Sequence, residues 1–216
     1  MRSAPPLPPL PLVECQRRAS PGPAPPDDGE WGAAAAFALA QWSGAPDPLA
    51  ETLGPSTFRL LWDPTALHLR VEVAFATLHV DPTRSTSDKS HGLWDFDVAE
   101  LFLSRGPEPL PYGEVEGSPL GQYLDYLILT PRTDLDRRWR SGASVRGALA
   151  RDRFTVEIDL PWAALATTAA AGTTRRFNVL VAQGPPAQRR HLCFSPTGTP
   201  APDFHVPARF AHLVLG

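Results

Sequence analysis

The segment SHGLWDFDVAELFLS, residues 90–104, gathers one tryptophan and three acids within a few positions. Two carboxyl groups that face one cleft are the machinery of glycoside hydrolysis. In the strand that this segment predicts, Asp97 and Glu100 differ by three positions and therefore point to opposite faces. Asp95 and Asp97 share a face, but nothing nearby would keep either one protonated as a general acid requires. We therefore do not expect an enzyme.

Other catalytic and metal signatures are missing from the sequence. There is no G-x-S-x-G, and the six histidines show neither H-x-x-x-H nor H-E-x-x-H spacing. The single methionine is Met1, which removes the Met–His pair of some haem-binding sandwiches. Cys15 and Cys193 have no metal-binding spacing, and we expect two unpaired buried thiols, with one bridge between them as the alternative.

The tryptophan of this segment suggests recognition of a sugar instead. Trp94 follows a long polar stretch, residues 77–93, and precedes a strand that carries Glu100 on an otherwise apolar face. An exposed indole can stack on the C–H face of a sugar ring, and a nearby carboxylate can accept from its hydroxyls. The alternative is that Trp94 simply plugs the end of a core, as the inward patterns of Trp62 and Trp162 predict for those two residues.

The elements that must position these residues are strands. Residues 57–62 and 67–75 alternate between apolar and polar side chains, and the turn DPTA between them predicts a hairpin. Turn signals recur every 8–12 residues, which is typical of an antiparallel β-sandwich. Further strands are predicted near residues 96–104, 112–118, 123–130, 145–150, 153–160, 176–183, 190–194 and 211–215.

Composition limits the domain plan and the partners. Residues 25–216 are expected to form one β-sandwich domain, and the proline-rich residues 1–24 an extended arm or an edge strand. The net charge is −3 without a basic block, so we expect no nucleic-acid partner, and no apolar run reaches the ~20 residues of a membrane span. No export signal is visible, so the localisation stays open, with the cytoplasm as the default and secretion if the start codon is misassigned. We expect a monomer.

Five segments, taken together in order and spacing, resemble the family 9 carbohydrate-binding modules of the wider DOMON-like β-sandwich group. They are FRLLWDPTALHLRVEV, LWDFDVAELFLS, EVEGSPLGQYLDY, FTVEIDLPW and SPTGTPAPDFHVPARFAHLVL, and the resemblance covers roughly residues 25 to 215. It implies a non-catalytic module in which two aromatic rings hold a terminal sugar of a glycan. The first ring falls on Trp94, the second on Phe204, and a sugar-binding carboxylate on Glu100.

The chain departs from the family at other contact positions. The family's arginine and asparagine fall on Glu116 and Ser118, and its glutamine on Leu180. We expect the fold to transfer better than the ligand, with Glu116 and Ser118 as polar walls. The resemblance also allows a structural calcium ion, whose ligands cannot be assigned here, and no other cofactor is expected. The alternative function is a protein-interaction or structural β-sandwich module without a sugar ligand.

Overall fold

The computed structural model describes residues 8–22 and 24–216, and strands dominate it. The helices are α1 (Asp28–Ala33) and α2 (Ala50–Leu53), with the 3-10 turns η1 (Leu93–Asp95), η2 (Trp162–Leu165), η3 (Pro186–Gln188) and η4 (Pro207–Arg209). The strands are β1 (Leu12–Arg17), β2 (Ala36–Ala38), β3 (Ala40–Gln41), β4 (Thr57–Trp62), β5 (Ala66–Ala74), β6 (Val98–Ser104), β7 (Tyr112–Gly117), β8 (Tyr123–Thr130), β9 (Asp134–Asp136), β10 (Ser144–Leu149), β11 (Arg153–Pro161), β12 (Thr174–Gln183), β13 (Arg190–Cys193) and β14 (Ala211–Leu215). None of the helices in the described part of the chain combines the length and hydrophobicity that crossing a membrane requires.

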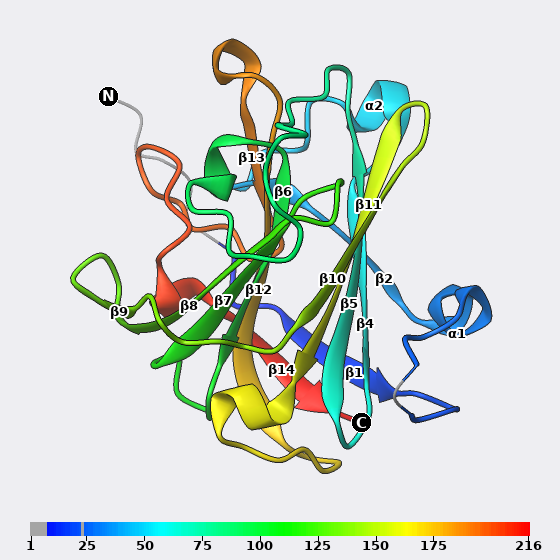
Figure 1. Ribbon diagram of the computed structural model, residues 1–216, viewed down its shortest axis with the longest axis vertical. Helices are drawn as coiled ribbons and strands as arrows, with labels where there is room; N and C mark the ends of the chain where they lie inside the picture. The colour runs from blue at the N-terminus through cyan, green and yellow to red at the C-terminus, as the bar shows by residue number, and fades with distance from the viewer. Residues whose placement is uncertain (1–7, 23) are drawn as a thin grey trace.

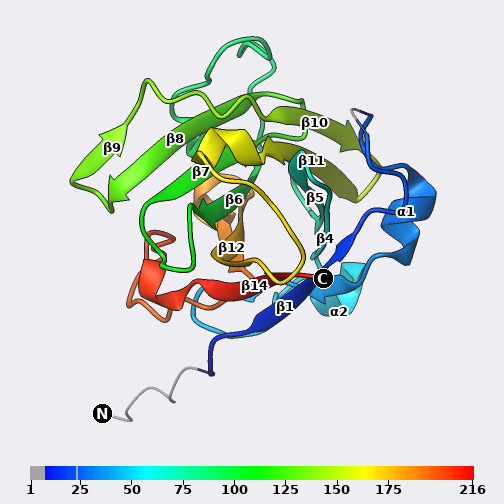
Figure 2. The same cartoon turned by 90° about the horizontal axis from the view of Figure 1, so that it is seen from below.

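The strands form two facing layers, which confirms the predicted β-sandwich (Figures 1 and 2). One layer has the order β10-β11-β5-β4, and the other has the order β14-β12-β6-β7-β8-β9. Strand β1 joins them, because Leu12–Cys15 pair with β14 and Gln16–Arg17 pair with β4, both in parallel. The other pairs of named strands in the described residues are antiparallel, including the predicted hairpin β4–β5.

The proline-rich segment contributes this joining strand rather than an edge strand. Residues 12–15 pair with β14 and residues 16–17 with β4, so the strand passes from one layer to the other. The first seven residues, which include the first three of the PPLPPLP run at residues 5–11, lie outside the described residues. The possibility that the run itself binds a partner stays a prediction.

The main core lies between the two layers. On β11 the inward residues alternate with half-buried ones, as the sequence predicts, and Phe154, Val156 and Ile158 are fully buried. Trp62 and Trp162 belong to the same core, as predicted, and their indole N–H groups donate to backbone carbonyls of Gly216 and Asp63. Cys15 and Cys193 are both buried and unpaired, as expected.

Strand β6 is buried on both faces, and this explains the odd position of its glutamate. Ala99, Leu101 and Leu103 face the main core. Val98 and Phe102 face away from it, into a second apolar cluster on the outer side of β6–β8, and Glu100 points the same way. Other members of this outer cluster come from β7, β8, β12 and the last loops of the chain; they include Tyr112, Leu124, Ile128, Leu180 and Phe210.

Candidate binding site

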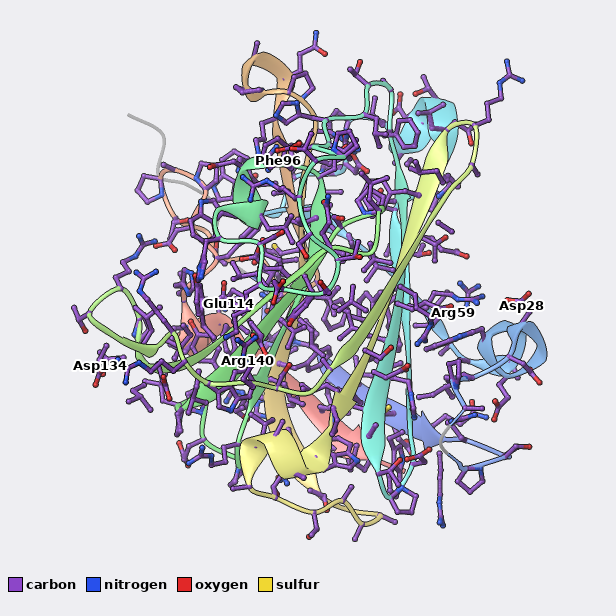
Figure 3. The ribbon with its side chains drawn as sticks, in the orientation of Figure 1. Asp28, Arg59, Phe96, Glu114, Asp134 and Arg140 are labelled. Carbon is purple, nitrogen blue, oxygen red and sulfur yellow. The ribbon has the colours of Figure 1, made fainter. Side chains whose placement is uncertain are left out.

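The outer face of β6–β8 carries a pocket of ≈ 540 Å³. Strand residues form its floor, and loop residues form most of its walls. The floor consists of Glu100, Glu114, Glu116, Tyr126, Ile128 and Ala182, and the walls include Trp94, Arg132, Leu135, Arg137, His191, Pro202, Asp203, Phe204 and His205. Figure 3 places Glu114 on this β7 side of the molecule, whereas Arg59 and Asp28 lie on the far side, beyond β4.

Four of the five predicted site residues lie in this one pocket: Trp94, Glu100, Glu116 and Phe204. Ser118 is the exception and does not line it. Its hydroxyl is buried in the turn after β7, where it donates to the Gln122 side chain at 2.9 Å and accepts from backbone amides of that turn. Ser118 therefore shapes the β7–β8 turn and forms no wall of the pocket.

Trp94 is exposed over 43% of its surface and stands on a turn that is firmly held. Leu93, the residue before it in η1, is completely buried in the outer cluster. The Arg189 guanidinium donates to the backbone carbonyls of Trp94 and Phe96, the latter at 2.6 Å. The indole is thus presented to the pocket by an ordered turn, which lowers the entropy lost when a ligand binds.

Phe204 comes from the loop between β13 and η4. Its ring meets the His191 ring edge-on, with 5.8 Å between centroids. The preceding residue, Asp203, accepts from the His205 amide at 2.9 Å and pairs with Arg132. These contacts hold Phe204 against the outer cluster with part of the ring still accessible.

The three glutamates of the floor form one group. Glu100 and Glu116 face each other across β6 and β7, and Glu114 lies two residues from Glu116 on the same face. One carboxylate oxygen from each lies within 4.8 Å of the others. All three residues are at most 4% exposed. Both oxygens of Glu116 and one of Glu114 have no hydrogen-bond partner among the described residues.

Burial and mutual repulsion make these carboxylates reluctant to ionise. Burial, with the charge of Glu114, raises the pKa of Glu100 well above its usual range. Burial and the charges of Glu100 and Glu114 do the same to the pKa of Glu116. Burial also raises the pKa of Glu114, to about 7. The negative charge of the floor therefore has to be compensated by a proton, a hydrogen-bond donor or a cation.

The cations around the pocket are engaged elsewhere. Arg132 pairs with Asp203, and Arg137 lies over the Tyr126 ring at 5.5 Å. Burial, followed by a neighbouring arginine charge, lowers the pKa of both His191 and His205, which are therefore neutral at pH 7. In the part of the chain that the structure describes, no basic side chain forms an ion pair with the three glutamates.

Asp97 and Glu100 separate as predicted, but the prediction that Asp95 and Asp97 share a face is wrong, because Asp95 lies on the 3-10 turn η1 before the strand begins. Asp97 is buried and accepts from the backbone amides of His79 at 2.9 Å and Gly184 at 2.6 Å, so its role is structural. Asp95 is exposed on η1 and does not line the pocket. Glu100 is the only one of the three that reaches the floor.

Sequence reasoning missed Glu114 and most of the loop residues. The signal for Glu114 was present in YGEVEG, because two glutamates two positions apart on a strand share a face. The contributions of His191, His205 and Arg132 have no local signal, because three distant segments bring them to the pocket.

Comparison with known protein families identifies one family. The family model described as "Carbohydrate family 9 binding domain-like" matches residues 27–216. A proposed carbohydrate-binding protein from Bacteroides uniformis is 16% identical, with a TM-score of 0.74, over 96% of this chain and 100% of that one. A search of curated proteins finds no significant match.

Two further structures are those of a family 9 carbohydrate-binding module from Caldicellulosiruptor kristjanssonii. Its complex with glucose is 15% identical, with a TM-score of 0.67, over 95% of each chain. Its complex with cellotriose is 15% identical, with a TM-score of 0.66, over 94% of this chain and 92% of that one. At these identities the structures show the shared fold, and the family model shows the family. The chain belongs to the carbohydrate family 9 binding domain-like family.

Proposed function

We propose that the pocket on β6–β8 binds the terminal sugar of a glycan, without catalysing a reaction on it. The observation that carries this proposal is the combination, in one pocket of ≈ 540 Å³, of an exposed indole on a firmly held turn and buried carboxylates. Pockets of about 300–1,000 Å³ are usual for small ligands. Sugar rings need this combination, because they have apolar C–H faces and hydroxyl edges.

The residues divide between these two tasks. Trp94 offers the broad apolar surface on which a ring stacks, and Phe204 offers a second, smaller one. The floor glutamates present acceptors for hydroxyl groups. A shallow pocket that holds one or two rings displaces ordered water and buries little surface, so we expect weak affinity.

The relatives suggest the first ligands to try. The Caldicellulosiruptor kristjanssonii module has been crystallised with glucose and with cellotriose, which makes the end of a β-glucan a reasonable probe. The floor and walls here determine which sugar fits best, and a panel of mono- and oligosaccharides should decide it.

A hydrolytic role has weak support in this arrangement. A catalytic pair needs carboxyl groups on either side of the scissile bond. Here the three carboxyl groups lie together on the floor, on adjacent strands, and each is almost completely buried. We expect no turnover of chromogenic glycosides.

Isothermal titration calorimetry with a glycan panel tests the proposal. Wild type should bind at least one saccharide at millimolar or lower concentration, and Phe204→Ala and Glu100→Gln should weaken that binding. Leu149→Ala is a matched control, because Leu149 is 48% exposed on β10, outside the pocket, and its loss should change nothing. Absence of binding across the panel, or unchanged affinity in both pocket variants, would refute the proposal.

A further inference from the structure

The glutamates on the pocket floor create an electrostatic problem that the described residues do not solve. Two carboxylates directly opposite each other on neighbouring strands destabilise a sheet when both are ionised, and Glu100 and Glu116 occupy such a pair of positions. Glu114 adds a third carboxylate on the same face. Buried carboxylates normally have ion-pair or hydrogen-bond partners, because leaving them without one costs several kcal/mol.

The unpartnered oxygens belong to two glutamates that line the pocket. Glu116 is 1% exposed and neither of its oxygens has a partner, and Glu114 is 4% exposed with one oxygen unpartnered. Both side chains line the pocket together with Glu100. The unpartnered oxygens therefore belong to side chains that border the pocket, and the oxygens themselves are buried.

The size of the group fits a hard divalent cation. One oxygen of each glutamate lies within 4.8 Å of the other two. Two oxygens that bind the same calcium ion at about 2.4 Å each lie at most about 4.8 Å apart, so the spacing of the three oxygens is compatible with one shared ion. Carboxylate oxygens are the ligands that calcium prefers, and three carboxylates supply between three and about six of them.

From this geometry we infer that Glu100, Glu114 and Glu116 bind one calcium ion at the floor of the pocket. The ion supplies the positive charge that Arg132, Arg137 and Arg189 do not, since those side chains are engaged with Asp203, an aromatic ring and backbone carbonyls. The site lies on two adjacent central strands, so its ligands are held on a rigid scaffold.

The ion would also change what the pocket offers a ligand. Calcium takes about six to eight oxygens, so positions beyond those filled by the glutamates face the pocket. Resting on the proposed function, we infer that two neighbouring hydroxyls of the bound sugar fill these positions while its ring stacks on Trp94. Saccharide binding should then depend on calcium.

Calcium titration of the full chain, freed of metal by a chelator, tests the cation site without any sugar. Calorimetry should show one calcium ion bound per chain, and calcium should raise Tm. Glu116→Gln and Glu114→Gln should each weaken calcium binding at least about 10-fold, the loss that even an indirect partner of a metal can cause. Glu108→Gln, which removes an exposed acid outside the pocket, should bind calcium like wild type.

The stability of the variants separates loss of a ligand from loss of the fold. Without calcium, Glu116→Gln should have a Tm at least equal to that of wild type, because it removes like-charge repulsion. With calcium, its Tm should rise much less than that of wild type. A wild type that binds no calcium at millimolar concentration, or one that prefers magnesium, would overturn the inference, as would unchanged calcium affinity in both glutamine variants.

Titration of cellotriose with calcium and with chelator distinguishes this inference from the proposed function. Stronger binding with calcium supports both. Equal binding in chelator keeps the proposed function and overturns the role of the ion in sugar binding. Calcium binding without any saccharide binding across the panel keeps the cation site and overturns the proposed function.

Discussion

Trp94→Ala should weaken saccharide binding about 10-fold and leave the fold intact. The indole is 43% exposed, so of an aromatic surface of about 250 Å² roughly 100 Å² can still be covered. A sugar ring stacked on one face would cover about half of this. At about 25 cal/mol per Å² the loss is about 1.3 kcal/mol, or close to 10-fold in affinity.

Calorimetric titration of wild type and Trp94→Ala with the best saccharide of the panel measures this loss. Trp94 belongs to neither core cluster, so Tm should fall by no more than about 4 °C, which corresponds to about 1 kcal/mol in a chain of this size. Leu149→Ala again serves as the control for removal of an exposed apolar side chain. If Trp94→Ala binds the sugar as tightly as wild type, ring stacking on Trp94 is refuted.

Three further predictions concern the supports of the site and the fold. Burial raises the pKa of Asp63, but hydrogen bonds from Thr65 and the next amide outweigh this and lower the pKa to about 2. The ionised form of Asp63 therefore adds about 2 kcal/mol to the free energy of unfolding above pH 4, and this contribution is lost as the pH falls towards 2. The difference in unfolding free energy between wild type and Asp63→Asn, measured in urea, should shrink by this amount between pH 6 and pH 2, and a constant difference would contradict the prediction. Gly147→Ala should destabilise the folded protein by about 1–3 kcal/mol, because the new Cβ would lie 2.4 Å from a backbone carbonyl of the β7–β8 turn. Gly106→Ala is the control: its new Cβ meets no atom within 4 Å, so its stability in the same unfolding assay should equal that of wild type. Arg189→Ala should loosen the η1 turn, because the guanidinium donates to backbone carbonyls of that turn. Amide hydrogen exchange in η1 should become faster and saccharide binding weaker. Unchanged exchange in η1 would argue against an anchoring role of Arg189.

Local patterns in the sequence predict most of the strands. Alternation and turn residues define the β4–β5 hairpin, and strands predicted at 123–130 and 211–215 form with those bounds. The parallel pairing of β1 with β14 and β4 has no such signal. It joins segments from opposite ends of the chain, and pairing at that distance depends on the whole fold rather than on local spacing.

Burial of polar side chains was also hard to predict. The alternation of β5 puts His68 on the wetter face, yet it is buried, 2.7 Å from Asp159 and 3.3 Å from Asp63. The segment around α1 covers that face, with Arg18 bound to Asp63 and Glu30. Periodicity identifies which side chains share a face, but it cannot show what covers that face.

The same limit applies to the pocket. The resemblance to family 9 modules identified Trp94, Glu100, Glu116 and Phe204, all of which line it. Ser118 was predicted from its alignment alone, and the close turn after β7 takes its side chain away from the pocket. A shared fold preserves strand positions better than it preserves the direction of side chains in turns.

The central claim is that a saccharide stacks on Trp94 in the pocket on β6–β8. Titration of ¹⁵N-labelled protein with cellotriose, observed at the indole N–H signals of the six tryptophans, tests it most directly. We predict a progressive shift of the Trp94 signal, while those of Trp62 and Trp162, buried and bonded to backbone carbonyls, stay in place. If the Trp94 signal does not move while the sugar binds, or moves with no saccharide in the panel, the account is contradicted.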